Sequence, residues 1–340
     1  MKNTNAKKAT ASYKTSYEEK SKNDNVTQPL LTAPCIDKLS IIVPNITDEQ
    51  YIKGVEQNLW NAVKFPELGL ANAKKALGYK TCMTINHVPN TKTLVTSSPL
   101  LLQLDHYNKS RPQIRMEWNP AKMTYEFSNQ VDDIFQVNFG FGFYEILGKS
   151  KITRIDLAVD IFNMDLESLL VKVKNKRIAR TFFNQDGEIA TMTFGGSKGN
   201  QYVLYSKSEQ MGVANFGSTV RIEARMRPKG LWMKNIADMA NPLSAVQIFN
   251  LDCIDNAIDN GFWNAFRDSC RYRGVNNALK LQSGKIKAKL KKAVNENSAD
   301  WWNPELFWGE HWINILDDCE FLDLPACPDL TYANAAGENK

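Results

Sequence analysis

The chain has 340 residues, of which 43% are hydrophobic and 10% aromatic, and its formal net charge is +5. This length and composition exclude a disordered or fibrous protein and suit one large or two ordinary globular domains. The six cysteines form no C-x-x-C pair, a pattern typical of reduced intracellular thiols. The sequence has no apolar run of 18 residues, so we expect a cytoplasmic protein that makes no membrane contact.

The N-terminal part predicts a tail followed by strands and two helical stretches. Residues 1–34 are rich in Lys, Asn, Thr and Ser, which predicts a disordered basic tail. A strand is expected over residues 36–44, and a capping box at Thr47 predicts a helix that runs to about Val63. The next elements are strands at 81–87, 94–98 and 114–118 and a partly helical aromatic stretch at 130–147.

The remaining elements follow from the spacing of apolar residues, which recur at every second position in a strand and at every third or fourth position in a helix. They are a central strand at 151–160, a helix at 165–174, strands at 190–194, 201–206 and 219–226, and helices at 230–239, 243–259, 262–270 and from 301 onward. The order predicts an α+β fold, with a central antiparallel sheet followed by a mostly helical C-terminal region. The expected divisions are a tail (1–34), an α+β domain (35–227), a helical basic region (228–328) and a loose tail (329–340).

The central strand carries an unusual set of charges on one face. Arg154, Asp156 and Asp160 share one parity of an otherwise apolar strand. In the strand at 219–226, the residues of one parity are Arg221, Glu223 and Arg225. Charges on a sheet face must be solvated, paired or bound to a ligand. Two interpretations stay open at this point: a site for a metal and a phosphate, or a ladder of Arg–carboxylate pairs between neighbouring strands.

The carboxylates on the predicted strands are candidate ligands for a divalent cation. The three histidines lie far apart and form no H-E-x-x-H motif, so zinc hydrolase chemistry is not expected. Oxygen ligands suit Mg²⁺ or Mn²⁺. The candidates are Glu117, Asp156, Asp160 and Glu223. Such an ion would polarise a phosphoryl oxygen, and nearby arginines would offset charge in the transition state.

Tyrosine is the candidate nucleophile. The segment 201–209 places Tyr205 and Lys207 on one face of a strand and Tyr202 on the other. A tyrosine hydroxyl needs a metal or a cation to stabilise its phenolate, and Lys207 is spaced to help Tyr205. Most strand tyrosines serve packing, which is the alternative here.

Basic residues suggest a polyanionic partner. Between residues 267 and 292 the sequence holds nine Lys and Arg residues against one acid, Asp268, the pattern expected of a nucleic-acid contact. A solvated helix face is the alternative. The candidate contacts are Arg271, Arg273, Lys285, Lys287 and Lys289, with Lys122 after a strand end and Lys198 in the glycine-rich link at 195–200.

Five short motifs in one order resemble the rolling-circle replication initiation factors of phages and plasmids. They are Ile36-Asp-Lys-Leu39, Met116-Glu-Trp-Asn-Pro-Ala-Lys122, Thr153-Arg-Ile-Asp156, Val203-Leu-Tyr-Ser-Lys207 and Val220-Arg-Ile-Glu-Ala-Arg225. The resemblance covers roughly residues 36–250, and among these proteins it is greatest to the replication-associated nicking endonucleases of filamentous phages.

The resemblance implies that the protein nicks one DNA strand at an origin through a 5′-phosphotyrosyl link and leaves a 3′-hydroxyl that primes synthesis. It assigns the nucleophile to Tyr205, with Tyr202 in reserve, and the acidic site positions to Asp156, Glu223 and Glu117. Arg154, Arg221 and Arg225 would contact DNA. In the plasmid branch a tyrosine precedes the Phe-Gly-Ser turn, whereas this chain has Thr193 there, which disfavours the plasmid type.

The expected partners are origin DNA, single-stranded or supercoiled, together with a host helicase and polymerase. Two rival hypotheses stay open: an initiator that binds its origin without cutting it, and a metal-dependent nuclease that uses water.

Overall fold

The structure is a computed structural model that describes residues 29–44, 46, 48–74, 78–88, 97–176, 178–211, 218–250 and 260–325. The loose C-terminal tail predicted at 329–340 lies outside these residues, as do most of the N-terminal tail and of the strand predicted at 94–98. None of the described helices is long and apolar enough to cross a membrane.

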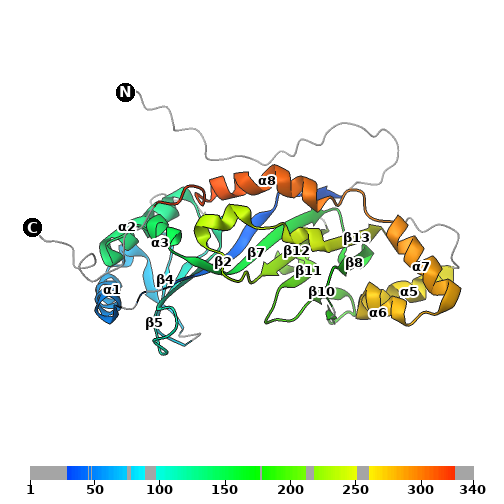
Figure 1. Cartoon of the computed structure of the whole chain (residues 1–340), viewed down its shortest axis with the longest axis horizontal. Helices are drawn as coiled ribbons and strands as arrows, with labels where there is room; N and C mark the ends of the chain where they lie inside the picture. Colours follow the sequence, from blue (N-terminus) through cyan, green and yellow to red (C-terminus); the bar gives the residue numbers. More distant parts are fainter. Residues whose placement is uncertain are drawn as a thin grey trace, which may run out of the picture.

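One large antiparallel sheet dominates the described part of the chain (Figure 1). Its strand order is β3-β4-β5-β6-β2-β7-β12-β11-β10-β9, and β1 also pairs with β7. The strands are β1 (Leu30–Leu31), β2 (Cys35–Val43), β3 (Leu70–Asn72), β4 (Tyr79–Ile85), β5 (Leu100–His106), β6 (Ile114–Trp118), β7 (Lys151–Phe162), β9 (Ala179–Phe183), β10 (Ile189–Phe194), β11 (Gln201–Ser206) and β12 (Thr219–Met226). A smaller antiparallel pair is formed by β8 (Leu169–Val173) and β13 (Val246–Asn250).

Helices cover the apolar face of the sheet. The helices are α1 (Glu49–Ala62), α2 (Tyr125–Phe139), α3 (Phe143–Gly148), α4 (Lys207–Met211), α5 (Asn260–Arg273), α6 (Val275–Lys280), α7 (Gly284–Glu296) and α8 (Pro304–Asp318). The main core joins the sheet to α1, α2, α3 and α8. Figure 1 shows α8 running along the sheet and α1 to α3 gathered at one end. This arrangement confirms the predicted α+β fold.

The alternation of side chains along β7 explains why one face is buried and the other polar. Ile155, Leu157 and Val159 are at most 1% exposed and belong to the main core. Residues of the opposite parity include Arg154, Asp156 and Asp160 and point to the other face, because successive side chains of a strand alternate. The sheet therefore has an apolar face beneath the helices and a charged face, which we call the open face.

A second, smaller core lies at the other end of the molecule. It is built from residues of α5, α6 and α7 packed on β8 and β13, with Trp263, Phe266, Leu290 and Val294 among its buried members. Figure 1 shows these three helices together, beyond the edge of the large sheet that ends in β9.

Several predicted elements differ from the structure. The segment predicted as a helix at 165–174 is a 3₁₀ turn, Leu166–Ser168, followed by β8. The helix predicted at 243–259 begins in a 3₁₀ segment, Pro242–Ala245, and continues as β13, and its last nine residues lie outside the described part. The helix predicted at 230–239 is a short 3₁₀ segment, Met233–Asp238. Asp48 caps α1, because its carboxylate accepts the N–H groups of Gln50 and Tyr51; Thr47, at which the capping box was predicted, lies outside the described residues.

Candidate active site

The candidate nucleophile lies in a continuous row of paired residues on the open face. Tyr205 of β11 is directly opposite Arg221 of β12, and Arg221 is opposite Asp160 of β7. Directly opposed residues of antiparallel strands point to the same face with their Cβ atoms about 5 Å apart. The register therefore brings a phenol, a guanidinium and a carboxylate together from three strands.

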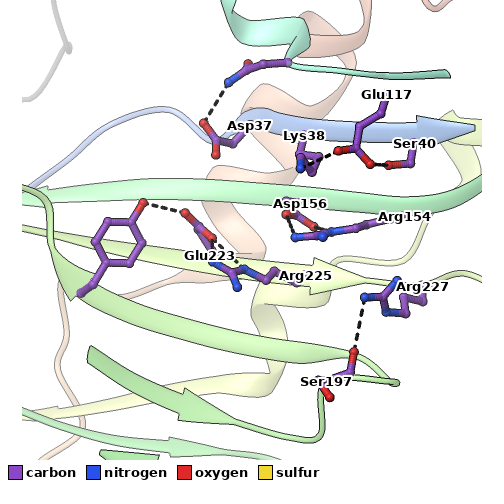
Figure 2. Close-up of polar contacts among 12 residues, drawn as sticks. Asp37, Lys38, Ser40, Glu117, Arg154, Asp156, Ser197, Glu223, Arg225 and Arg227 are labelled. Carbon is purple, nitrogen blue, oxygen red and sulfur yellow. Dashed lines mark hydrogen bonds and ion pairs between the residues drawn. The ribbon is translucent and has the colours of Figure 1, made fainter. Parts of the chain in front are cut away.

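Tyr205 donates a hydrogen bond to Glu223. Its Oη lies 2.6 Å from Glu223 Oε1, and the other carboxylate oxygen, Oε2, accepts Arg225 Nη2 at 2.7 Å and Nε at 2.9 Å. The side chain of Glu223 is 6% exposed, whereas that of Arg225 is 34% exposed. Figure 2 shows the Glu223–Arg225 pair on the same face as Arg154 and Asp156. A proton acceptor is thus in place at hydrogen-bond distance from the phenol.

The phenol of Tyr205 is protonated in this arrangement. Burial raises its pKa, and so do the hydrogen bond to Glu223 and the charge of that carboxylate, while Arg221 lowers it. The net effect is a pKa above the ordinary value. To act as a nucleophile, this tyrosine must pass its proton to Glu223 as the new bond forms.

Arg221 is held by two carboxylates beside Tyr205. Its Nε and Nη2 donate to Asp160 Oδ1 and Oδ2 at 2.6 and 2.7 Å. Its Nη1 donates to Asp37 Oδ1 at 3.2 Å, and Asp37 also accepts the amide of Asn119 at 3.2 Å. A guanidinium fixed by two partners keeps one orientation, which suits the recognition of a phosphate.

Three more ion pairs extend the polar network across β7, β2 and β6. Arg154 donates to both oxygens of Asp156, at 2.8 and 2.5 Å. Burial raises the pKa of Asp156 despite this contact. Glu117 of β6 accepts Lys38 at 2.7 Å and Ser40 at 2.6 Å (Figure 2). It also accepts Arg115 at 2.6 Å. The same face therefore holds cations and anions from four strands in addition to β11.

These contacts define what we call the ion-pair network. Its ten members are the cations Lys38, Arg115, Arg154, Arg221 and Arg225 and the anions Asp37, Glu117, Asp156, Asp160 and Glu223. The alternative interpretation of the sequence, a ladder of Arg–carboxylate pairs between neighbouring strands, describes part of this arrangement. Arg221 pairs across strands, with Asp160 and Asp37. The other three arginines, Arg115, Arg154 and Arg225, each pair with a carboxylate two residues away on their own strand.

The carboxylates proposed as metal ligands are already engaged by donors. Both oxygens of Glu117, Asp156, Asp160 and Glu223 accept hydrogen bonds from Lys, Arg, Ser or Tyr side chains. Among the described residues, no group of three or more His, Cys, Asp or Glu side chains is arranged to hold a metal ion. In this arrangement the residues do not fit Mg²⁺ or Mn²⁺, and the predicted metal requirement stays a prediction.

Of the other two predicted catalytic residues, Tyr202 lies on the face of β11 opposite to Tyr205, as the alternation predicts, whereas Lys207 lies elsewhere than expected. Tyr202 is 3% exposed in the main core, and its Oη donates to the carbonyl oxygen of Pro242 at 3.0 Å, so a DNA phosphate cannot reach it. Lys207 is not on the strand, because β11 ends at Ser206 and Lys207 begins α4, where Nζ donates to Gln210. Burial and the charge of Arg221 lower the pKa of Lys207.

The predicted DNA contacts divide into exposed and anchored side chains. Lys122, Lys198 and Arg273 are exposed. Arg271 has a structural role instead: Nη2 donates to the carbonyl oxygen of Glu167 at 2.8 Å, and its own carbonyl accepts Thr181 Oγ1. The glycine-rich link at 195–200 joins β10 to β11 as a hairpin, and Arg227 of the chain after β12 donates to Ser197 O at 3.3 Å (Figure 2).

The basic residues of α7 project from the small core. Residues 284–289 are all exposed, and the first buried residue of the helix is Leu290. The first two turns therefore carry Lys285, Lys287 and Lys289 away from the body of the protein. A helix exposed on every side is typical of an element that binds a partner or is fully solvated.

Sequence analysis missed Asp37, Lys38 and Arg115 as members of the site. Asp37 and Lys38 lie in the Ile36–Leu39 motif, but the motif by itself does not indicate what their charged side chains bind. Their engagement depends on β2 lying between β6 and β7, a long-range pairing that no local pattern specifies.

The charge on Glu117 predicts a pH-dependent contribution to stability. Burial favours a raised pKa, but Lys38, Ser40 and Arg115 outweigh it and lower the pKa from 4.5 to about 2. Because the folded-state pKa is depressed, the stabilisation is complete above pH 4.5 and is lost as the pH falls towards 2. We expect the difference in unfolding free energy between the unsubstituted protein and Glu117→Gln to shrink by about 3 kcal/mol over this interval. Urea unfolding at pH 6, 4 and 2.5 measures it, and a difference that does not change with pH would contradict the assignment.

Comparisons with known proteins add one distant similarity. No family model matches the sequence, and no curated protein matches it. Among solved structures, the chain is similar to a rolling circle replication initiator protein from Geobacillus stearothermophilus, with a TM-score of 0.36 and 18% sequence identity over 72% of this chain and 98% of that chain. A similarity at this TM-score carries no argument about activity, so function has to be derived from the side chains of the open face.

Proposed function

We propose that this protein initiates rolling-circle replication by nicking and rejoining one strand of origin DNA through Tyr205. The observation that carries the proposal is the 2.6 Å hydrogen bond from Tyr205 Oη to Glu223 Oε1, set between Arg221 and Arg225 on the open face. A hydroxyl that is hydrogen-bonded to a carboxylate base and flanked by guanidinium groups has the nucleophile, the proton acceptor and the positive charges that phosphoryl transfer to a side chain requires.

The reaction balances with groups of this chain and water. Tyr205 Oη attacks the phosphorus of a phosphodiester while its proton passes to Glu223. The bond from phosphorus to the 3′ oxygen breaks, and that oxygen takes a proton from water. The hydroxide left behind takes the proton held by Glu223, and the 5′ phosphate stays bound to tyrosine. Arg221 and Arg225 would stabilise the added negative charge on the equatorial phosphate oxygens. The reverse attack by a 3′-hydroxyl rejoins the strand without ATP, because the covalent link keeps the phosphodiester free energy.

An assay on supercoiled DNA that contains the origin of the parent replicon tests the proposal. After denaturation, a labelled strand attached to the protein would support tyrosine attack, free nicked DNA would support a nuclease that uses water, and intact DNA would support a non-catalytic initiator. The last alternative is favoured by one observation, the pairing of every oxygen of the four candidate carboxylates described above. Parallel reactions with Mg²⁺, with Mn²⁺ and with EDTA test the metal prediction, since a requirement for metal would mean that guanidinium groups release some of these oxygens.

Affinity for DNA would come largely from α7. The exposed Lys285, Lys287 and Lys289 lie at the opposite end of the molecule from α1 (Figure 1). Phosphate contacts release counterions, so each one makes the affinity more dependent on salt.

Replacing these three lysines by glutamine should therefore weaken binding to duplex DNA and flatten its salt dependence. We expect the slope of log K against log salt to become less steep by up to about 3. Fluorescence anisotropy with a labelled duplex between 50 and 200 mM salt measures both effects. The matched control replaces Lys53, Lys64 and Lys74, which are also exposed, and equal losses in the two variants would contradict a specific role of α7.

A further inference from the structure

The edge strand β9 brings an aromatic side chain into the row that contains Tyr205. Phe182 pairs with Thr191 of β10, and Thr191 pairs with Tyr205 of β11. Paired residues of antiparallel strands share a face, so Phe182 lies on the open face. It is two strands from Tyr205, which corresponds to roughly 10 Å between their backbones.

The neighbouring row adds a cation, Arg180, on the same strand as Phe182. Arg180 pairs with Thr193, Thr193 with Val203, and Val203 with Glu223. Arg180 is exposed, whereas Thr191 and Thr193, which lie on β10 between β9 and β11, are half-buried. Their short side chains leave the aromatic ring and the guanidinium standing above this part of the sheet.

The packing of β9 uses other residues and leaves Phe182 exposed. Phe183 pairs with the buried Ile189 and contacts Tyr272 of α5, with ring centroids 5.1 Å apart. Thr181 also faces α5, through its bond to the carbonyl of Arg271. Phe182 and Phe183 are successive residues of β9, so their side chains point to different faces. Phe182 is 52% exposed as a result.

We propose that Phe182 is a stacking platform for a base of single-stranded DNA next to the scissile phosphate, and that Arg180 binds a neighbouring phosphate. This inference rests on the proposed function for its choice of ligand. A single strand offers both an uncovered π-face and a phosphate within a short span, which matches an aromatic ring beside a guanidinium. Bases of a duplex are already stacked on each other and cannot use the ring. A protein partner would need a larger apolar surface than one phenylalanine beside an arginine.

The test separates stacking from charge with two probes of equal length. The full-length protein is titrated into fluorescein-labelled (dT)₂₀ and into a labelled abasic 20-mer, which keeps the phosphates but has no bases. Phe182→Ala should weaken binding of (dT)₂₀ by about 5- to 100-fold and leave binding of the abasic strand unchanged. Phe182→Tyr should bind both as the unsubstituted protein does, whereas Arg180→Gln should weaken both to the same extent.

Controls keep the outcome interpretable. Phe65→Ala removes a phenylalanine of similar exposure, 53%, that lies outside the sheet next to α1, and it should not change either affinity. Unaltered far-UV circular dichroism checks the fold of each variant. The inference is overturned if Phe182→Ala binds (dT)₂₀ as tightly as the unsubstituted protein, or if it loses affinity equally for the abasic strand. These binding measurements require no cleavage. Their result is therefore independent of whether Tyr205 forms a covalent adduct with DNA, which is the test of the proposed function.

Discussion

Tyr205→Phe should form no covalent protein–DNA product, a loss of at least about 10³-fold. The substitution removes Oη and keeps the ring, so the packing of β11 is preserved. Glu223 keeps its contacts with Arg225, which means that the carboxylate is not left without a partner. The measurement is a denaturing gel of radiolabelled origin DNA after reaction, with binding of the same DNA measured separately and expected to stay within a factor of about two.

The matched control for this experiment is Tyr202→Phe. Tyr202 lies three residues earlier on the same strand but on the buried face, where it donates to Pro242 O. Its loss should lower the unfolding free energy by about 1 kcal/mol and leave the covalent product intact. An adduct that persists in Tyr205→Phe and disappears in Tyr202→Phe would reverse the assignment of the nucleophile.

Glu223→Gln should slow formation of the covalent product by about 10²- to 10⁴-fold at neutral pH. Glutamine has almost the same shape and can still form a hydrogen bond with Tyr205, but it cannot take up the proton. The carboxylate also raises the pKa of Tyr205, so its removal lets the phenol ionise at a lower pH. We therefore expect the defect to become smaller as the pH rises from 6 to 10, because hydroxide replaces the missing base.

Single-turnover rates across this pH range measure the effect. Glu209→Gln serves as the control, since Glu209 is an exposed carboxylate of α4 close to the same strand end, and it should react at the unsubstituted rate. A defect in Glu223→Gln that is the same at every pH would show that Glu223 positions Tyr205 without accepting its proton.

Periodicity was sufficient to predict the strands that carry the site. Along β7 and β12 the alternation of apolar and charged residues predicted both strands, and within each strand it predicted which charges share a face: Arg154 with Asp156, and Arg221 with Glu223. That the two faces coincide follows from the register of β12 on β7. The secondary-structure predictions were wrong where a strand partner distant in the sequence determines which structure the segment adopts. Residues 165–174 have apolar residues at both helical and strand spacing, and they form β8 because β13, more than 70 residues later, pairs with them.

The contacts within the site could not be predicted in the same way. Tyr205 meets Glu223 because the register of β11 on β12 places Tyr205 opposite Arg221, and a shift by one residue would send the tyrosine to the core. The chain between these strands gives no turn signal that fixes this register. Lys207 was misplaced because strand ends are poorly specified by alternation, and here the helix α4 begins directly after Ser206.

The ion-pair network contains five cations and five anions, so the network itself is close to electrically neutral. Its cations are already paired with carboxylates, so the network attracts nucleic acid less than an equal number of unpaired cations would. The distant lysines of α7 would bring the protein to DNA of any sequence, while a strand segment enters the ion-pair network only if it can exchange partners with these ion pairs. Capture and cutting would thus be governed by different parts of the molecule, which would protect DNA bound at unsuitable places from being broken.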